Sequence, residues 1–193
     1  KRPFDLSVLI LAALVLLPVW VPLVLAVALA IRLDGPGPVI VRQPRLGRCG
    51  RAFGMLKFRT MVEGAERLTG PAWSPRHDPR VTRIGSVLRR WHLDELPQAV
   101  NVLRGEMSLV GPRPERPELA ALVEREVPGF AARLAVRPGI AGLAQAKGAG
   151  HRNPGRKLRC DLDYIETMGP LLDLKLIATC VRRTLKKRMR ARR

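Results

Sequence analysis

Residues 6–31 read LSVLILAALVLLPVWVPLVLAVALAI, a continuous run without a charged residue. A straight helix of this length would reach roughly 39 Å, enough to cross a hydrocarbon core of about 30 Å. Pro18 and Pro22 lie in the middle of the run, where each removes a backbone N–H donor and disfavours a continuous helix. Pro18 divides the run into arms of roughly 18 and 20 Å, and neither would cross the bilayer alone. The run therefore predicts a membrane segment that is broken near its midpoint.

Basic residues flank this run on both sides. Lys1 and Arg2 precede it and Arg32 follows it. Lysine and arginine beside membrane segments favour the cytoplasmic side, so a hairpin that enters and leaves the same leaflet suits both flanks. A kinked spanning helix also tolerates proline, and the run alone leaves both arrangements open. A signal peptide is the third alternative, but its apolar core is usually only about 7–15 residues.

Turn formers separate the apolar run from the rest of the chain. Asp34-Gly35-Pro36-Gly37-Pro38 follows it, and a helix cannot continue through this combination. We therefore expect a membrane segment over residues 1–33 and a second unit over residues 34–193, long enough for one modest domain with its own core. The three cysteines are scattered without a metal-binding spacing and indicate reduced thiols.

The chain is strongly basic. Its 35 lysine and arginine residues against 16 acidic ones give a net charge of +19, which implies a polyanionic partner. Aromatic residues are only 4%, so base-stacking surface is scarce, and the sequence has no nucleic-acid-binding motif. An anionic membrane surface and phosphorylated substrates therefore explain the charge better than nucleic acid does. The basic residues 182–193 would either lie along lipid headgroups or form a disordered tail.

Turn formers and hydrophobic patterning divide the second unit into short elements. Paired strands are expected at residues 39–41 and 53–61, with a loop at 63–80. Helices are expected at residues 87–92, 94–103, 118–126, 158–167 and 171–187, with a turn at 137–139 and a loop at 147–155. The pattern predicts an α+β fold that is mostly helical and has a small sheet.

Asp94 and Glu95 are the only adjacent acidic residues in the chain, and they follow Arg89 and Arg90 closely. Because Pro97 is tolerated only in the first turn of a helix, we expect a helix to begin near Asp94, with Asp94 as its N-cap. At that position its carboxylate would accept backbone N–H bonds at the positive end of the helix dipole, which favours the ionised form. Such a carboxylate could be a nucleophile or a metal ligand, although aspartate also caps helices without any catalytic role.

Several basic clusters could bind phosphate. Arginine offers a planar fork for bidentate binding and lysine adds a compact charge, although a solvated surface charge is the commoner role of any single arginine. The clusters are Lys57-Phe58-Arg59, Arg89-Arg90, Gly111-Pro112-Arg113-Pro114 and Val136-Arg137-Pro138-Gly139. A Walker A loop and a GxGxxG motif are absent from the sequence, so these clusters do not belong to a P-loop enzyme.

The motifs, in their order along the chain, resemble those of the bacterial sugar transferases, the monotopic phosphoglycosyl transferases. They are Lys1-Arg2-Pro3-Phe4-Asp5, Gly37-Pro38-Val39, Lys57-Phe58-Arg59-Thr60-Met61, Leu93-Asp94-Glu95-Leu96-Pro97-Gln98, the block of residues 101–114, Arg137-Pro138-Gly139-Ile140 and Leu172-Asp173-Leu174-Lys175. The resemblance covers essentially the whole chain, and residues 93–114 are its most specific part.

The resemblance implies an enzyme that transfers a sugar-1-phosphate from a UDP-sugar to a polyprenol phosphate such as undecaprenyl phosphate and releases UMP. It implies that Asp94 attacks the sugar-bearing phosphate to form a phosphosugar-aspartate intermediate, and that Glu95, with Asp94, binds Mg²⁺ or Mn²⁺. Phosphate and substrate binding is assigned to Lys57, Arg59, Arg89, Arg113 and Arg137. We expect these side chains to converge on one cleft beside Asp94.

The resemblance also implies a monotopic protein on the cytoplasmic face of a bacterial inner membrane. Its re-entrant helical hairpin and interfacial amphipathic helices would contact anionic lipids, and its reaction would start the assembly of a capsule, an exopolysaccharide or a lipopolysaccharide. The family bends its membrane helix at a Ser-Pro pair, whereas this chain has Leu17-Pro18, followed one turn later by Pro22. We expect Pro22 to strengthen the break, which favours the hairpin over the spanning helix.

The sequence departs from the family pattern in two further places. Residues 138–142 read PGIAG where the family has PGITG. Residues 145–149 read QAKGA and lack an arginine that the family often has there, and Arg152 is a candidate replacement. The alternative function is a membrane-tethered, non-enzymatic polyanion-binding protein. It would explain the charge and the anchor, but not an acidic pair inside a long motif block.

Overall fold

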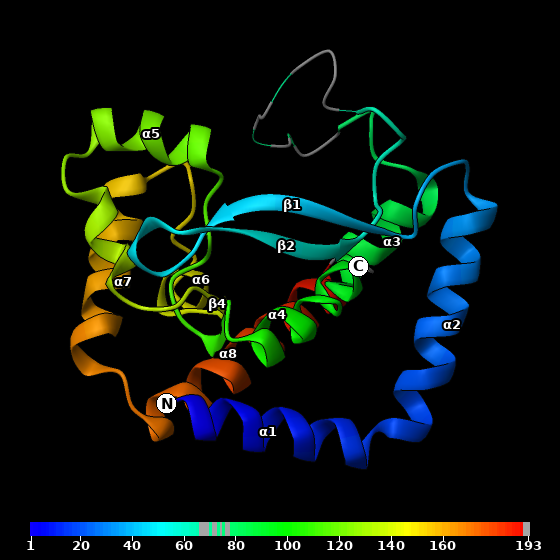
Figure 1. The fold of residues 1–193 in the computed structure, drawn as a ribbon, viewed down its shortest axis with the longest axis horizontal. Helices are drawn as coiled ribbons and strands as arrows, with labels where there is room; N and C mark the ends of the chain where they lie inside the picture. Colours follow the sequence, from blue (N-terminus) through cyan, green and yellow to red (C-terminus); the bar gives the residue numbers. More distant parts are fainter. Residues whose placement is uncertain (66–69, 71–72, 74, 76–77, 191–193) are drawn as a thin grey trace.

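The computed structural model describes residues 1–65, 70, 73, 75 and 78–190. Two N-terminal helices, α1 (Arg2–Val15) and α2 (Leu17–Leu33), form an L that frames the rest of the chain on two sides (Figure 1). The remaining elements combine helices with two small sheets, so the α+β expectation is confirmed.

The predicted break in the apolar run is confirmed, but it lies at Leu16, before both prolines. The helices α1 and α2 meet there at 83°. Pro18 stands in the first turn of α2, where its missing N–H has no intrahelical partner in any case. Pro22 lies inside α2 and does not interrupt it, so the expectation that Pro22 strengthens the break is wrong.

The bent pair is the only part of the described chain with the length and composition of a membrane segment. Within the described residues, no single helix is both long enough and apolar enough to cross a bilayer, whereas α1 and α2 meet the requirement together. Their outward side chains are strongly exposed, with Leu11 64%, Leu14 67%, Leu25 63% and Leu29 61% accessible. These side chains form an exposed apolar surface on both arms of the L.

Polar side chains fix the first turn of α1 to the rest of the chain. The Nζ atom of Lys1 donates to Tyr164 Oη at 2.8 Å and to Asp173 Oδ2 at 2.5 Å. Asp5, only 1% exposed, accepts a hydrogen bond from Ser108 Oγ at 2.8 Å. A charge that is buried in this way needs its partners, so these contacts fix the start of the L against the domain.

The first sheet is the antiparallel pair β1 (Ile40–Leu46) and β2 (Ala52–Phe58), joined by the short turn η1 (Arg48–Gly50). The predicted pairing is confirmed, although β1 is longer than expected and β2 ends at Phe58, before the predicted end at residue 61. The pair runs from the corner between α2 and α3 (Arg83–Trp91) toward α5 (Pro117–Glu126) (Figure 1). Asn101, fully buried, accepts from Leu56 N at 2.9 Å and donates to Gly54 O at 3.0 Å, which docks α4 (Gln98–Arg104) against β2.

The segment that carries the acidic pair differs from its prediction. The helix α3 begins earlier than expected, capped by Thr82, whose Oγ1 atom accepts from Gly85 N at 2.9 Å. The helix ends at His92, which adopts the left-handed conformation at φ 52°. Asp94 then lies in the short 3₁₀ helix η2 (Leu93–Glu95), ahead of α4. The prediction that Asp94 is an N-cap is therefore wrong.

The C-terminal half is mainly helical, as expected. Its elements are α5, the 3₁₀ helix η3 (Phe130–Ala135), α6 (Leu143–Ala146), α7 (Pro154–Thr167) and α8 (Pro170–Arg190). The predicted helices at residues 118–126, 158–167 and 171–187 are confirmed, and α7 begins earlier because Asn153 caps it by accepting from Arg156 N at 2.9 Å. The basic tail is helical as far as residue 190, and residues 191–193 lie outside the described part.

A parallel pair, β3 (Ser108–Val110) and β4 (Gly139–Ala141), was not predicted. Gly139 begins β4, so the expected turn at residues 137–139 is wrong at this position. The backbones approach closely at three glycines. A Cβ on Gly111 would lie 2.5 Å from Arg137 O, one on Gly142 would lie 2.5 Å from Gly111 O, and one on Gly139 would collide with Gly111 N. This packing fixes the loop that follows β3.

We expect Gly139→Ala to lower the free energy of unfolding by about 1–3 kcal/mol, the usual cost of overpacking. The reason is that the added methyl would collide with the backbone at Val110 and Gly111. Chemical denaturation in detergent micelles measures the change. Gly155→Ala in the first turn of α7 is the matched control, because its Cβ meets nothing within 4 Å. Equal stabilities of the two variants would contradict the prediction.

Candidate active site

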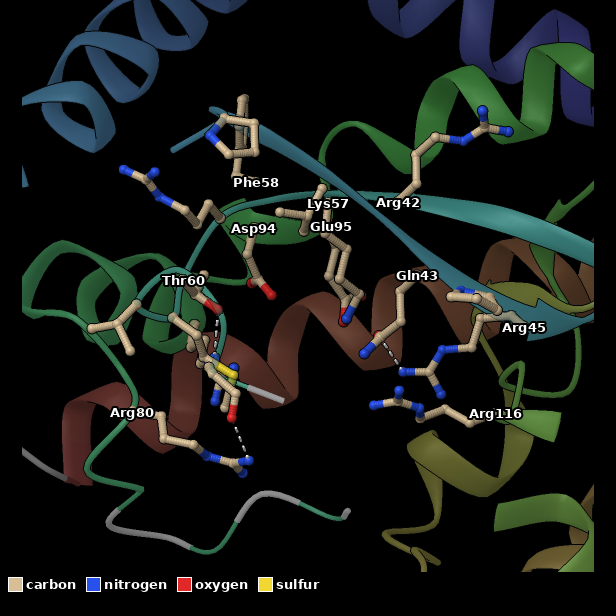
Figure 2. Close-up of a pocket in the computed structure, with 18 of the residues that line it drawn as sticks. Arg42, Gln43, Arg45, Lys57, Phe58, Thr60, Arg80, Asp94, Glu95 and Arg116 are labelled. Carbon is tan, nitrogen blue, oxygen red and sulfur yellow. Dashed lines mark hydrogen bonds and ion pairs between the residues drawn. The ribbon is translucent and has the colours of Figure 1, made fainter. Parts of the chain in front are cut away.

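A cavity of about 730 Å³ lies beside β1 and β2, between α3, η2 and the segment that follows β3. Asp94 and Glu95 lie in its middle, with Thr60 on one side and Arg45 and Arg116 on the other (Figure 2). The structure brings six of the predicted site residues to this cavity: Lys57, Arg59, Arg89, Asp94, Glu95 and Arg113. Arg137 does not line it, so for this residue the expected convergence is wrong.

Asp94 is 7% exposed, on the central turn of the cavity. Burial raises the pKa of Asp94, and the negative charge of Glu95 adds to this effect, while the positive charges of Lys57 and Arg113 oppose it. Among the described residues, none donates a hydrogen bond to the Asp94 carboxylate. The expected N-cap position would instead have given this carboxylate backbone N–H donors. A desolvated carboxylate without donors is a better nucleophile than one whose lone pairs are occupied.

Glu95 is held between two cations. Arg113 donates to both carboxylate oxygens, at 3.3 Å to Oε2 and more closely to Oε1, and Lys57 Nζ lies 3.7 Å from Oε1. Burial alone would raise the pKa of Glu95, but the charges of Arg113 and Lys57 and the hydrogen bond from Arg113 outweigh it and lower the pKa to about 2. Glu95 is therefore a fixed anion at neutral pH.

Lys57 reaches the same space from β2, where it pairs with Val41 of β1. Burial and the charge of Arg113 lower its pKa to about 8, against the attraction of Glu95 and Asp94. Arg89 enters from α3 and donates from Nε to Thr60 Oγ1 at 2.8 Å. The cavity therefore holds an excess of positive charge around the two carboxylates, which suits a polyanionic ligand.

Arg59 has a different set of contacts from its neighbours in the cavity. Its terminal nitrogens donate to backbone carbonyls at the end of α2, including Ile31 O at 2.8 Å and Gly35 O at 2.6 Å. The guanidinium is thus already committed to protein acceptors. Arg59 therefore supports the structure around the site. These contacts differ from the phosphate binding that the sequence predicted for this residue.

Buried charges that no sequence motif predicted support Arg113. Arg133 donates from Nη2 to the Arg113 carbonyl at 2.7 Å and from Nε to Asp161 Oδ2 at 2.8 Å. Glu115, which follows Arg113 after Pro114, pairs with Lys157. The side chains of Arg133 and Asp161 are 2% and 1% exposed. Partners 28 and 42 positions apart leave no spacing pattern in a sequence.

Asp94 and Glu95 are also the candidate metal ligands. The described part of the chain holds no cluster of three or more histidine, cysteine, aspartate or glutamate side chains that would bind a metal ion by itself. Mg²⁺, however, is usually held by one or two carboxylates together with substrate phosphates and water. Two adjacent carboxylates, one of them free of protein donors, fit a metal that is shared with a phosphorylated ligand.

The chain thus combines a cation-lined cavity around an Asp-Glu pair, whose charge suits phosphorylated ligands, with a bent apolar helix pair. The chain matches the bacterial sugar transferase family over residues 1–187, and it belongs to that family. The resemblance that the motifs indicated is therefore confirmed.

Curated relatives match nearly the whole chain. It is 44% identical to the undecaprenyl-phosphate glucose phosphotransferase of Komagataeibacter xylinus, over 96% of this chain and 36% of the relative. It is 43% identical to the UDP-glucose:undecaprenyl-phosphate glucose-1-phosphate transferase of Caulobacter vibrioides, over 94% and 68%. Exopolysaccharide production protein PSS of Rhizobium leguminosarum is 42% identical, over 92% and 90%. The chain thus spans about a third of the first relative and most of the third.

Glu95 should give the protein a specific sensitivity to acid. Its pKa is lowered from 4.5 to about 2 in the folded state, so its contribution to stability is present above the unfolded value and is lost as pH falls toward 2. We expect the stability difference between wild type and Glu95→Gln to shrink between about pH 5 and pH 2. Denaturation in micelles at stepped pH measures it. Glu126→Gln, at an exposed position of α5, is the control, and parallel curves for wild type and Glu95→Gln would contradict the prediction.

Proposed function

We propose that this chain transfers a sugar-1-phosphate from a UDP-sugar to undecaprenyl phosphate and releases UMP. The observation that carries the proposal is the desolvated Asp94 beside the Arg113–Glu95 pair, inside a cation-lined cavity of a bacterial sugar transferase. The relatives from K. xylinus and C. vibrioides, named for transfer to undecaprenyl phosphate, support it. The R. leguminosarum relative, named for exopolysaccharide production, supports a role in surface glycan assembly.

The reaction would proceed in two displacements at phosphorus. A carboxylate oxygen of Asp94 attacks the sugar-bearing phosphorus, a new O–P bond forms, and the bond to the bridging oxygen breaks and releases UMP. A phosphate oxygen of undecaprenyl phosphate then attacks the same phosphorus, and the Asp94 carboxylate leaves unchanged. Phosphoryl transfer depends mainly on positioning and charge neutralisation, for which Lys57, Arg89 and Arg113 are placed.

Mg²⁺ fits this proposal as a shared ligand of Asp94 or Glu95 and the donor diphosphate. Bound there, the metal would neutralise charge on the phosphates and stabilise the leaving UMP. Glu95 is fixed by Arg113 and Lys57 and stays ionised, so it can offer a carboxylate of constant charge. Turnover in excess EDTA tests the metal, since full activity there would exclude it.

A membrane-tethered protein that only binds polyanions is the alternative. It would use the same basic cavity, but it would gain nothing from a buried aspartate without hydrogen-bond donors, because desolvation of a carboxylate weakens the fold. The state of Asp94 therefore favours catalysis over simple binding.

We expect Asp94→Asn to abolish both the covalent adduct and UMP release, because an amide is too weak a nucleophile. The assay incubates the protein with a panel of UDP-sugars and Mg²⁺, first without acceptor, for intact mass, and then with undecaprenyl phosphate, for UMP. Asp163→Asn, whose exposed carboxylate lies on α7, is the matched control and should retain full activity. An active Asp94→Asn enzyme would remove Asp94 from the mechanism.

The exposed apolar surface of the chain supports a placement at the membrane. The bent pair α1–α2 would be a re-entrant hairpin with both ends on the cytoplasmic face. Other exposed apolar residues lie on α3 and α4: Val87 and Trp91 on α3 are 49% and 47% exposed, and Val100 and Leu103 on α4 are 38% and 50% exposed. These two helices would lie at the interface with anionic lipids, beside a cavity that must receive a lipid phosphate.

We expect the double change Pro18→Leu, Pro22→Leu to straighten the break at Leu16 and to convert the hairpin into a spanning helix. Pro22→Leu alone is the control and should keep the hairpin, because Pro22 lies inside α2. Single cysteines placed before Lys1 and after Ile31, in a background without the native cysteines, are labelled with an impermeant reagent in intact cells. Periplasmic labelling of the upstream cysteine in the otherwise unchanged protein would refute the hairpin.

A further inference from the structure

The guanidinium of Arg59 closes the C-terminal end of α2. Only 7% exposed, it donates from Nη2 to Ile31 O at 2.8 Å and to Gly35 O at 2.6 Å, and from Nη1 to Pro36 O. The last carbonyls of a helix have no intrahelical donors, and a cation at that end is favourable. Arg59 therefore supplies hydrogen-bond donors to the backbone carbonyls where the chain leaves the apolar helix.

The turn after α2 is shaped around this guanidinium. Gly37 adopts φ 110°, and a Cβ at that position would collide with Arg59 Nη1 and lie 3.3 Å from Glu63 Oε2. A side chain larger than hydrogen would thus push the guanidinium away from the carbonyls. The short glycine-proline turn therefore leaves the space that the Arg59 guanidinium occupies.

A second contact ties the same end of α2 to α3. Asp34 Oδ2 accepts a hydrogen bond from Ile84 N, at the start of α3, at 3.1 Å. Ile31 of α2 packs with Phe58 and Leu88, and all three are at most 3% exposed. The end of the hairpin is therefore attached both to β2 and to α3, the two elements that flank the catalytic cavity.

Thr60, the residue after Arg59, connects this end of α2 to the cavity. Thr60 Oγ1 accepts from Arg89 Nε at 2.8 Å, and Thr60 O accepts from Thr82 N at 3.1 Å. Arg89 lines the cavity with Asp94, and the two attract each other electrostatically. A shift of Arg59 would move Thr60 directly, and through it Arg89.

We propose that Arg59 is a positioning residue that ties the depth of the α1–α2 hairpin to the geometry of the Thr60–Arg89 side of the cavity. This inference rests on the proposed function. A lipid-held acceptor presents its phosphate at a height set by the membrane, whereas a UDP-sugar reaches the cavity from solution. Loss of the Arg59 contacts would therefore impair the use of a membrane-held acceptor more than the use of the donor.

Arg59→Lys tests this inference, because a single ammonium cannot hold three carbonyls in the guanidinium geometry. With undecaprenyl phosphate in lipid nanodiscs, we expect the acceptor KM to rise roughly tenfold or more, the scale of a small misplacement of reacting groups, and the UDP-sugar KM to stay within about twofold. With geranyl phosphate, a short acceptor supplied in detergent solution, the rise in acceptor KM should be several times smaller. Arg125→Lys, an exposed arginine on α5, is the control.

Asp34→Ala provides the second variant, because it removes the α2–α3 contact and does not line the cavity. It should show the same selective rise in acceptor KM in nanodiscs, which keeps the test decisive if Arg59→Lys folds poorly. Equal loss with both acceptors, or a raised UDP-sugar KM, would show that Arg59 acts on substrate directly and would overturn the inference. A wild type that releases no UMP from any UDP-sugar would instead overturn the proposed function.

Discussion

The ion pair between Arg113 and Glu95 joins two parts of the chain that no local interaction brings together. Glu95 follows α3 in a short 3₁₀ turn, and Arg113 follows the parallel strand β3. The Arg113 side chain holds Glu95, while its carbonyl is held by Arg133, which is itself paired with Asp161. The partly buried pair with Glu95 thus fixes the side chain of Arg113, and the buried Arg133–Asp161 pair fixes its carbonyl. An arginine fixed at both ends is ready for a ligand without further reorganisation.

The same arrangement explains why two adjacent carboxylates differ in character. Glu95 receives the hydrogen bonds and the nearest charges and has a pKa of about 2, whereas burial raises the pKa of Asp94. The environment therefore separates a fixed anion from a desolvated, unshielded carboxylate. Such a division of two titratable groups by their surroundings is how enzymes assign different roles to chemically similar side chains.

The apolar helix pair is attached to the rest of the chain at both of its ends. Lys1 and Asp5 fix one end of the bent pair through Asp173 and Ser108, and Arg59 fixes the other end beside the cavity. Each of these contacts buries a charge, which is costly unless its partners are in place. The orientation of the L relative to the cavity is thereby specified at both of its ends, and the height of the site above a membrane would follow from it.

The sequence by itself determined the elements whose causes are local. Hydrophobicity and backbone stereochemistry predicted the uncharged run, the turn formers at 34–38, the paired strands and the C-terminal helices. Sequence motifs pointed to the acidic pair and to four of the basic residues that line the cavity. Only the tertiary structure decided the β3–β4 pair, the support of Arg113 by Arg133, the absence of Arg137 from the cavity and the use of Arg59 at the end of α2. These four features depend on contacts between segments that are distant in the sequence. In such contacts the partner that the fold brings close, and not the residue type alone, determines what a side chain binds.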